Sequence, residues 1–215
     1  MEKQISLRQA NFLSMNILPD SFYQRSDVVQ ISRELLGKYL FADIDGELTG
    51  GKIVETEAYS HVGDQACHSH LNRRTNRTEV MYRPGGVAYV YKVYGFHYLF
   101  NMITNVADKA DAVLVRAIEP TLGIEAMQRR RNLLSVTPRL TAGPGMLTQA
   151  MGITKQHYGL PLTTGETIWI EDWSETIAEE DIIASPRVGI DYAGADALLP
   201  WRFRVLGSKW TSKAK

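Results

Sequence analysis

The sequence has little cysteine, no long apolar run and no excess of charge of either sign. Its single cysteine, Cys67, cannot form an internal disulfide, so the disulfide framework of a small secreted protein is excluded and a reducing cytoplasm is the simpler location. The first residues lack the basic and apolar regions of a secretory signal. The longest apolar stretches, such as residues 112–115, fall far short of the roughly 20 residues that cross a bilayer. We therefore expect no contact with a membrane.

Charge is balanced overall but unevenly distributed. The 24 Lys and Arg residues offset 24 Asp and Glu residues, and 44% of the 215 residues are hydrophobic. Basic residues gather at 73–83, 129–139 and 202–215, whereas residues 171–181 carry acids without one base. One basic and one acidic face would give this pattern, and a basic face can follow a phosphate backbone. Unrelated, solvated charge runs are the alternative.

The chain shows no internal repeat, low-complexity tract or linker, so residues 1–215 are expected to form one domain, with 1–17 and 211–215 as peripheral tails. Hydrophobic periodicity and turn residues predict the elements. Strands are expected over residues 38–45, 52–59, 87–93, 97–103, 112–118, 167–170 and 203–206, and helices over 27–36, 119–131 and 143–150. The predicted fold class is α+β, with a mixed, largely antiparallel sheet flanked by helices and a protruding β-hairpin.

Two carboxylates lie on a strand that is otherwise apolar. The period of a strand puts Glu55 and Glu57 on one face. At a cleft, partial desolvation would make either one a candidate general base. A solvated strand face is the plainer interpretation, and paired carboxylates are also typical of O-glycosidases.

The loop over residues 60–74 contains His61, Asp64, His68 and His70, which could ligate zinc. Their spacing matches no compact zinc motif, so a histidine that contacts a ligand in a pocket is favoured over a metal site. A metal hydrolase built on these residues would lose its activity with a chelator.

Aromatic and cationic residues mark the strands that follow. Tyr89 and Tyr91 share one strand face, typical of core residues, whereas Tyr94 falls in the predicted turn, where its ring could wedge between base steps. Arg116 interrupts an apolar strand and needs a carboxylate partner, for which Glu57 is one candidate. Residues 142–145 begin a predicted helix whose N-terminus could hold a phosphate.

Seven ordered motifs together resemble the alkyladenine (3-methyladenine) DNA glycosylases, over residues 18–210. They are GKIVETEAY at 51–59, DQACH at 64–68, YVYKVYG at 89–95, Asn101, LVRAIEP at 114–120, GPG at 143–145 and RVGI at 187–190. The resemblance implies a base-excision repair enzyme that flips a damaged purine out of duplex DNA and hydrolyses its N-glycosidic bond.

The resemblance also implies roles for individual residues. Glu57 would be the general base that activates water, and Arg116 and the main-chain carbonyl of Val188 would position that water. Tyr94 would be the wedge that fills the place of the extruded nucleotide. The remaining residues would form the base pocket: Tyr59, His68 and Tyr91 as its walls, and Asn101 as a floor that disfavours the amino group of normal guanine. Tyr89 gains no role and remains a core residue.

The expected partner is double-stranded DNA containing damaged purines, bound by a monomer that uses no metal and no cofactor. The expected location is the cytoplasm, in association with the nucleoid if the source is bacterial. A non-catalytic damaged-DNA-binding module, with the same wedge and pocket, is the alternative. The presence of both Glu57 and Arg116 speaks against it.

Overall fold

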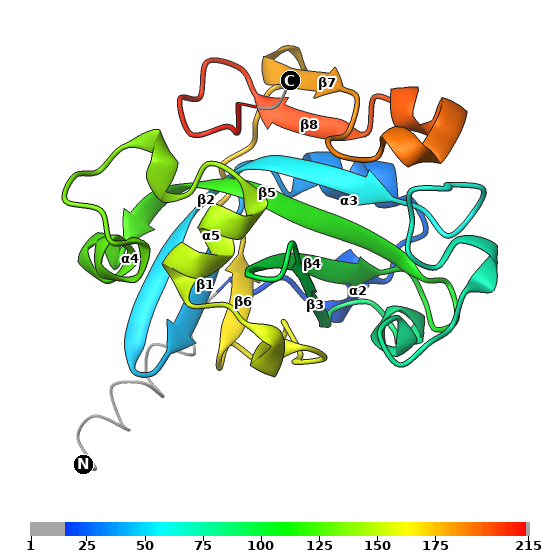
Figure 1. The fold of residues 1–215 in the computed structure, drawn as a ribbon, viewed down its shortest axis with the longest axis horizontal. Coiled ribbons are helices and arrows are strands. Elements are labelled where there is room, and N and C mark those ends of the chain that lie inside the picture. The colour runs from blue at the N-terminus through cyan, green and yellow to red at the C-terminus, as the bar shows by residue number, and fades with distance from the viewer. Residues whose placement is uncertain (1–15, 214–215) are drawn as a thin grey trace.

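The computed structural model describes residues 16–213, and its strands form one eight-stranded sheet in which every pairing is antiparallel (Figure 1). The order is β3–β4–β5–β2–β1–β6, with β8 paired to β2 and β7 paired to β8. The strands are β1 Tyr39–Ile44, β2 Glu47–Tyr59, β3 Ala88–Val93, β4 His97–Thr104, β5 Asp111–Leu122, β6 Ile168–Glu171, β7 Ile182–Ser185 and β8 Arg202–Val205. The α-helices described are α2 Asp20–Tyr23, α3 Val28–Glu34, α4 Ile124–Arg131 and α5 Pro144–Met151. The predicted α+β fold class is confirmed.

Short 3-10 helices occupy several of the connections. They are His70–Asn72, Glu79–Tyr82, Pro138–Leu140, Lys155–His157, Glu179–Asp181 and Asp191–Leu198. The loop predicted over residues 60–74 therefore contains one such turn and no longer element. No helix among residues 16–213 is long and apolar enough to cross a membrane.

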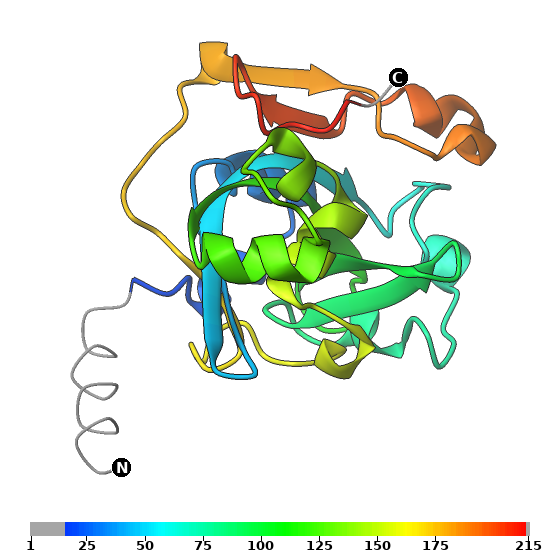
Figure 2. The ribbon, with the colours of Figure 1, turned by 60° about the vertical axis from the view of Figure 1, so that its left-hand side comes forward.

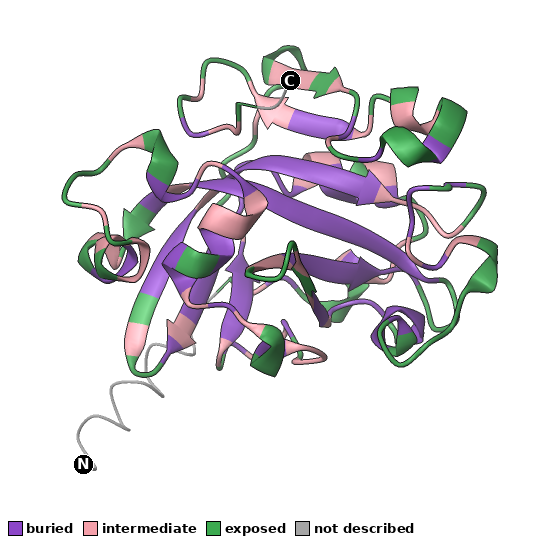
Figure 3. Ribbon diagram, viewed as in Figure 1, coloured by how far each residue is buried: buried purple, intermediate pink, exposed green. Residues whose placement is uncertain are grey.

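Strand β2 lies at the centre of the sheet. One of its edges pairs with β5, while the other pairs first with β1 up to Lys52 and then with β8 over residues 55–57. Because both edges are hydrogen-bonded and packed against other elements, residues 53–58 of β2 are buried (Figure 3). A charged side chain on this stretch therefore needs partners from within the protein.

Helix α3 follows the prediction made for residues 27–36. Asp27 caps its N-terminus by accepting a hydrogen bond from the Gln30 amide at 2.9 Å. Val28, Ile31 and Leu35 share one buried face, which packs on β2 and β5. Helix α5 packs on β4 and β5 and lies in front of the sheet in Figure 1, with α3 behind it. The two helices and the sheet enclose the main hydrophobic core.

The helix predicted over 119–131 is wrong in its first turn. Strand β5 continues to Leu122, pairing with Gly50 and Gly51 of β2, and the helix begins only at Ile124 after Gly123 at φ +67°. Pro120 can lie in the strand because β4 pairs with β5 only up to Leu114 and leaves this edge open.

The predicted connection between the first two strands is also misplaced. The turn is the dipeptide Asp45-Gly46, with φ +57° and +77°, and β2 resumes at Glu47. Gly50 and Gly51 lie within β2, where neighbouring chains approach closely: a Cβ on Gly51 would stand 2.3 Å from the Glu119 carbonyl oxygen. Strand β7 is absent from the prediction altogether.

The acidic segment 171–181 joins β6 to β7 and runs round the outside of the molecule (Figure 2). Three of its six acids form ion pairs with the body of the protein: Asp172 with Lys38 at 2.7 Å, Glu175 with Lys52 at 3.2 Å, and Glu179 with Arg33. These three ion pairs attach the segment to the fold.

The structure describes only part of each predicted tail. Most of the segment 1–17 lies outside the described residues, although Ile17 forms a bridge with Glu171. In the segment 211–215, Ser212 does not behave as part of a peripheral tail, because its amide and hydroxyl both donate hydrogen bonds to the buried Glu55 carboxylate.

Candidate active site

One cavity of about 400 Å³ gathers the residues that the sequence singled out. Its walls come from the β3–β4 hairpin, strand β5, the 59–68 loop, the N-terminus of α5 and the segment 188–192. Seven of the eight predicted site residues line it: Tyr59, His68, Tyr91, Tyr94, Asn101, Arg116 and Val188. The eighth, Glu57, lies directly behind this wall and contacts three of them.

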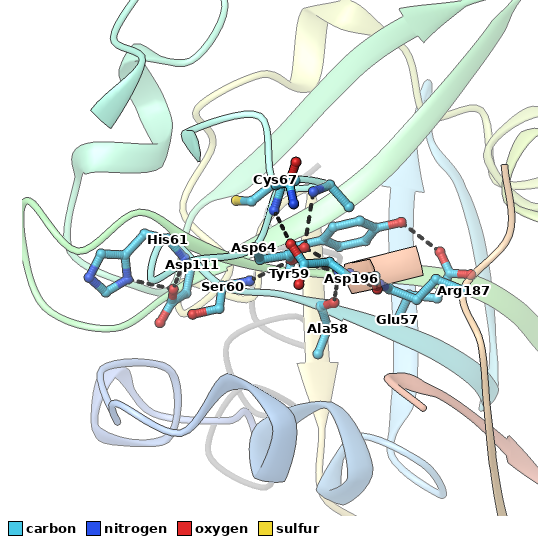
Figure 4. Close-up of polar contacts among 12 residues, drawn as sticks. Glu57, Ala58, Tyr59, Ser60, His61, Asp64, Cys67, Asp111, Arg187 and Asp196 are labelled. Carbon is cyan, nitrogen blue, oxygen red and sulfur yellow. Dashed lines mark hydrogen bonds and ion pairs between the residues drawn. The ribbon is translucent and has the colours of Figure 1, made fainter. Parts of the chain in front are cut away.

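Glu57 is fully buried, and each of its oxygens accepts hydrogen bonds. Its Oε2 accepts the Tyr59 hydroxyl at 2.8 Å (Figure 4), and its Oε1 accepts the Val188 amide at 2.8 Å. Arg116 Nη1 stands 3.1 Å from the same Oε1. The interpretation of Glu57 as part of a solvated strand face is therefore wrong. The carboxylate is held directly behind the cavity wall as half of a buried ion pair.

Another part of the cavity wall is aromatic. The Tyr91 ring lies 4.8 Å from the His68 ring and 5.1 Å from the Tyr89 ring, and the guanidinium of Arg77 lies 4.7 Å from the Tyr91 centroid. Asn101 is buried beneath them, and its Nδ2 donates to the Tyr89 carbonyl at 3.2 Å. Aromatic faces in this arrangement suit a flat, electron-poor ligand.

Tyr89 is both a core residue, as predicted, and part of the cavity wall. Its hydroxyl lies 2.9 Å from His68 Nδ1. Burial, and then the nearby charges of Arg77 and Arg73, lower the pKa of His68 to about 4. His68 is therefore neutral around pH 7 and brings no positive charge into the cavity.

The Tyr59 ring is fixed by a buried ion pair. Arg187 binds Asp64 through both terminal nitrogens, at 2.6 and 2.8 Å, and its guanidinium lies 4.7 Å from the Tyr59 centroid (Figure 4). Burial, and then the charge of Glu57, raise the pKa of the Tyr59 hydroxyl well above its ordinary value. The hydroxyl thus stays protonated and donates to Glu57.

Tyr94 stands at the tip of the β3–β4 hairpin, beside the mouth of the cavity. Its side chain is 83% exposed and its backbone has φ +51°, a conformation that costs a bulky residue roughly 1–2 kcal/mol. The hairpin packs against α5 close to its tip, since a Cβ on Gly145 would stand 2.7 Å from the ring of His97, the first residue of β4. A rigid hairpin therefore projects a large aromatic ring into solvent.

The proposed zinc ligands do not come together. His61 binds Asp111 at 2.7 Å, Asp64 binds Arg187, and His68 contacts Tyr89. Within residues 16–213 no group of three or more His, Cys, Asp or Glu side chains could hold a metal ion. The geometry gives the metal-hydrolase interpretation no support.

Some residues of the basic runs are ion-paired within the protein, and two others lie beside the cavity. Arg74 is paired with Glu79 and Asp108, and both Arg129 and Arg130 are paired with Glu47. By contrast, Arg73 and Arg77 line a second hollow that shares the His68 wall with the main cavity. The positive charge beside the cavity mouth therefore comes from a small part of the predicted basic face.

Several residues of the cavity wall could not be predicted from the sequence. Arg77 was visible only as one member of a basic run, while Met81 and Tyr192 carried no local signal. Residues 143–146, which form the N-terminus of α5, also contribute to the cavity wall. The sequence predicts a helix start here that could hold a phosphate.

A buried carboxylate therefore lies behind an aromatic cavity, and Tyr94 projects beside the mouth of that cavity. The chain belongs to the methylpurine-DNA glycosylase family, whose sequence profile matches residues 21–209, and the predicted membership of this enzyme family is confirmed. Three relatives are provisionally named 3-methyladenine DNA glycosylases. One from Bacillus licheniformis is 43% identical over 91% of this chain and 96% of the relative, one from Carboxydothermus hydrogenoformans is 45% identical over 92% and 99%, and one from Chlamydia felis is 43% identical over 87% and 95%.

The lowered pKa of His68 predicts a loss of stability in acid. Below pH 6.5 the unfolded chain protonates this histidine, whereas the native protein keeps it neutral until about pH 4, so the native state loses stability as the pH falls through this interval. His68→Asn keeps a donor near Tyr89 and should show a smaller decline in Tm between pH 6.5 and 4 than the wild type. Equal declines, or a native His68 NMR titration centred near pH 6.5, would contradict the assignment.

Proposed function

We propose that this protein flips an alkylated or deaminated purine nucleotide out of duplex DNA and hydrolyses its N-glycosidic bond with a water activated by Glu57. The observation that carries the proposal is the buried Glu57–Arg116 pair, in which Arg116 lines an aromatic cavity and Glu57 lies directly behind its wall. A module that only bound damaged DNA would have no use for a desolvated carboxylate there, because burying an ion pair costs free energy.

The chemistry needs one base and one nucleophile. Water attacks C1′ of the flipped nucleotide, its proton passes to the Glu57 carboxylate, and the C1′–N bond breaks with its electron pair going to the departing purine. Arg116 and the carbonyl oxygen of Val188 hold the water, while the Val188 amide holds Glu57. No lysine lies among the described residues of the cavity wall, so an amine for a Schiff-base lyase step is missing from it.

The cavity suits a cationic leaving base. A purine alkylated at N3 or N7 carries a positive charge and departs neutral, so it needs no general acid. Stacking against Tyr59 and Tyr91 favours such a cation over a neutral purine by roughly 1–2 kcal/mol. His68 is neutral and does not oppose it. Asn101 at the floor disfavours the amino group of normal guanine, whereas neutral lesions such as hypoxanthine require hydrogen bonds to the departing base.

Binding to DNA uses the hairpin tip and the positive charge beside it. Tyr94 enters the stack from the minor groove and fills the place of the extruded nucleotide. Arg73 and Arg77 neutralise backbone phosphates, so affinity falls with salt. The protein acts as a monomer in the cytoplasm, on chromosomal DNA, without a metal or a cofactor.

Replacement of the base tests the mechanism. Glu57→Gln keeps the shape and the contacts with Tyr59 and Val188 but cannot take a proton from water, so base release should slow by at least about 100-fold. Release from duplexes containing 3-methyladenine, 7-methylguanine, hypoxanthine or ethenoadenine is measured in EDTA, with the wild type beside the variant. A variant within a few-fold of the wild type would refute the assignment. Tight lesion binding by a wild type that releases no base would indicate the binding module.

Replacement of the wedge tests base flipping separately from hydrolysis. Tyr94→Ala leaves the vacated stack open and should weaken binding to lesion DNA, whereas Tyr94→Phe should retain binding because it keeps the ring. Ethenoadenine is fluorescent and is quenched in the stack, so its emission reports flipping directly. Unchanged affinity and emission with Tyr94→Ala would remove Tyr94 as the wedge.

A further inference from the structure

The second carboxylate of β2, Glu55, is fully buried but does not line the cavity. Four donors saturate it: Arg116 Nε at 2.8 Å, Arg202 Nε at 2.7 Å and Ser212 Oγ at 2.7 Å on Oε1, and the Ser212 amide at 2.5 Å on Oε2. Burial opposes the charged form, but Arg116, Ser212 and Arg202 outweigh it and lower the pKa of Glu55. Glu55 is therefore a fixed anion without capacity to accept a proton from water.

Arg116 connects this anion to the proposed base. Its Nε binds Glu55, its Nη2 donates to Ser212 Oγ at 3.2 Å, and its Nη1 faces Glu57 at 3.1 Å. Two corners of the planar guanidinium are thus held by groups outside the cavity, and the third is directed at Glu57. A rigid fork held in this way has lost its rotational freedom before any substrate binds.

The irregular backbone of β2 makes the arrangement possible. In a regular strand the two glutamates would project from one face about 6.5–7 Å apart. The pairing of β2 with β5 shifts register on both sides of Glu55, and such bulges re-aim side chains. Strand β8 pairs with β2 over residues 55–57, which brings Arg202 and the segment that follows β8 to Glu55.

We propose that Glu55 and Ser212 are positioning residues for Arg116, so that the segment after β8 sets the geometry of the hydrolytic centre. The inference rests on the proposed function, since it concerns the rate of the step assigned to Glu57. Ser212 contributes twice, because its hydroxyl donates to Glu55 and accepts from Arg116. Without the Ser212 hydroxyl the Arg116 guanidinium can rotate more freely. It then no longer keeps the attacking water in a fixed position relative to the Glu57 carboxylate.

The test separates the rate of chemistry from binding. Single-turnover base release is measured over a range of enzyme concentrations, which gives a maximal rate and a half-saturating concentration. Ser212→Ala should lower the maximal rate by about 10-fold and leave half-saturation within about 2-fold. Ser212→Thr keeps the hydroxyl and should restore the rate to within about 3-fold. The matched control is Thr211→Val, which removes a neighbouring hydroxyl that bonds only the Ser208 carbonyl, and it should behave as the wild type.

Glu55→Gln should lower the maximal rate further, by about 100-fold, and if it fails to fold, Ser212→Ala decides the matter. A folded Ser212→Ala protein that releases base at the wild-type rate would overturn the proposal. So would a loss that Ser212→Thr does not restore, or an equal change in rate and half-saturation. A wild type without activity would instead refute the proposed function, whereas an active wild type with an inactive Glu57→Gln and an active Ser212→Ala would refute the positioning role alone.

Discussion

The architecture of the site depends on one buried interaction, the contact of Arg116 on β5 with two carboxylates on β2. An unpaired ion in this interior would be prohibitively costly, so these charges require each other and require the strands that carry them to stay in register. Arg202 on β8 adds the second positive charge that balances the pair of acids. The same cluster therefore joins the central strands, attaches the C-terminal segment and leaves one carboxylate, Glu57, against the cavity.

The rest of the site is arranged around this cluster by a second buried ion pair. Asp64 and Arg187 tie the loop after β2 to the segment that carries Val188, and Arg187 also covers the Tyr59 ring. Glu57, its hydrogen-bond donors and the aromatic walls are in this way held in place by contacts within the protein. Such preorganisation is what the proposed hydrolysis would need, because little free energy then has to be spent on ordering the protein.

The sequence predicted those elements whose formation depends on residues close together in the chain. The helix at 27–36 and the β3–β4 hairpin have caps, periodicity and turn residues in the sequence, and both are present. Pro120 resembled a helix start because its place in β5 depends on pairing with β2, about 70 residues away in the chain. The ordered motifs led to seven residues of the cavity wall and to Glu57 directly behind it, but not to Arg77, Met81 or Tyr192. The partners Arg202 and Ser212 could not be predicted, since no short-range pattern relates them to Glu55.

The most direct test of the account is a double-mutant cycle between Glu57 and Arg116 in single-turnover base release. Lysine at position 116 keeps the charge but cannot bind both carboxylates as a planar fork does. If the two residues act as one unit on the water, the double variant Glu57→Gln/Arg116→Lys should be no slower than Glu57→Gln alone. Losses that multiply would show that Arg116 and Glu57 act independently, and would contradict the central place given to their contact.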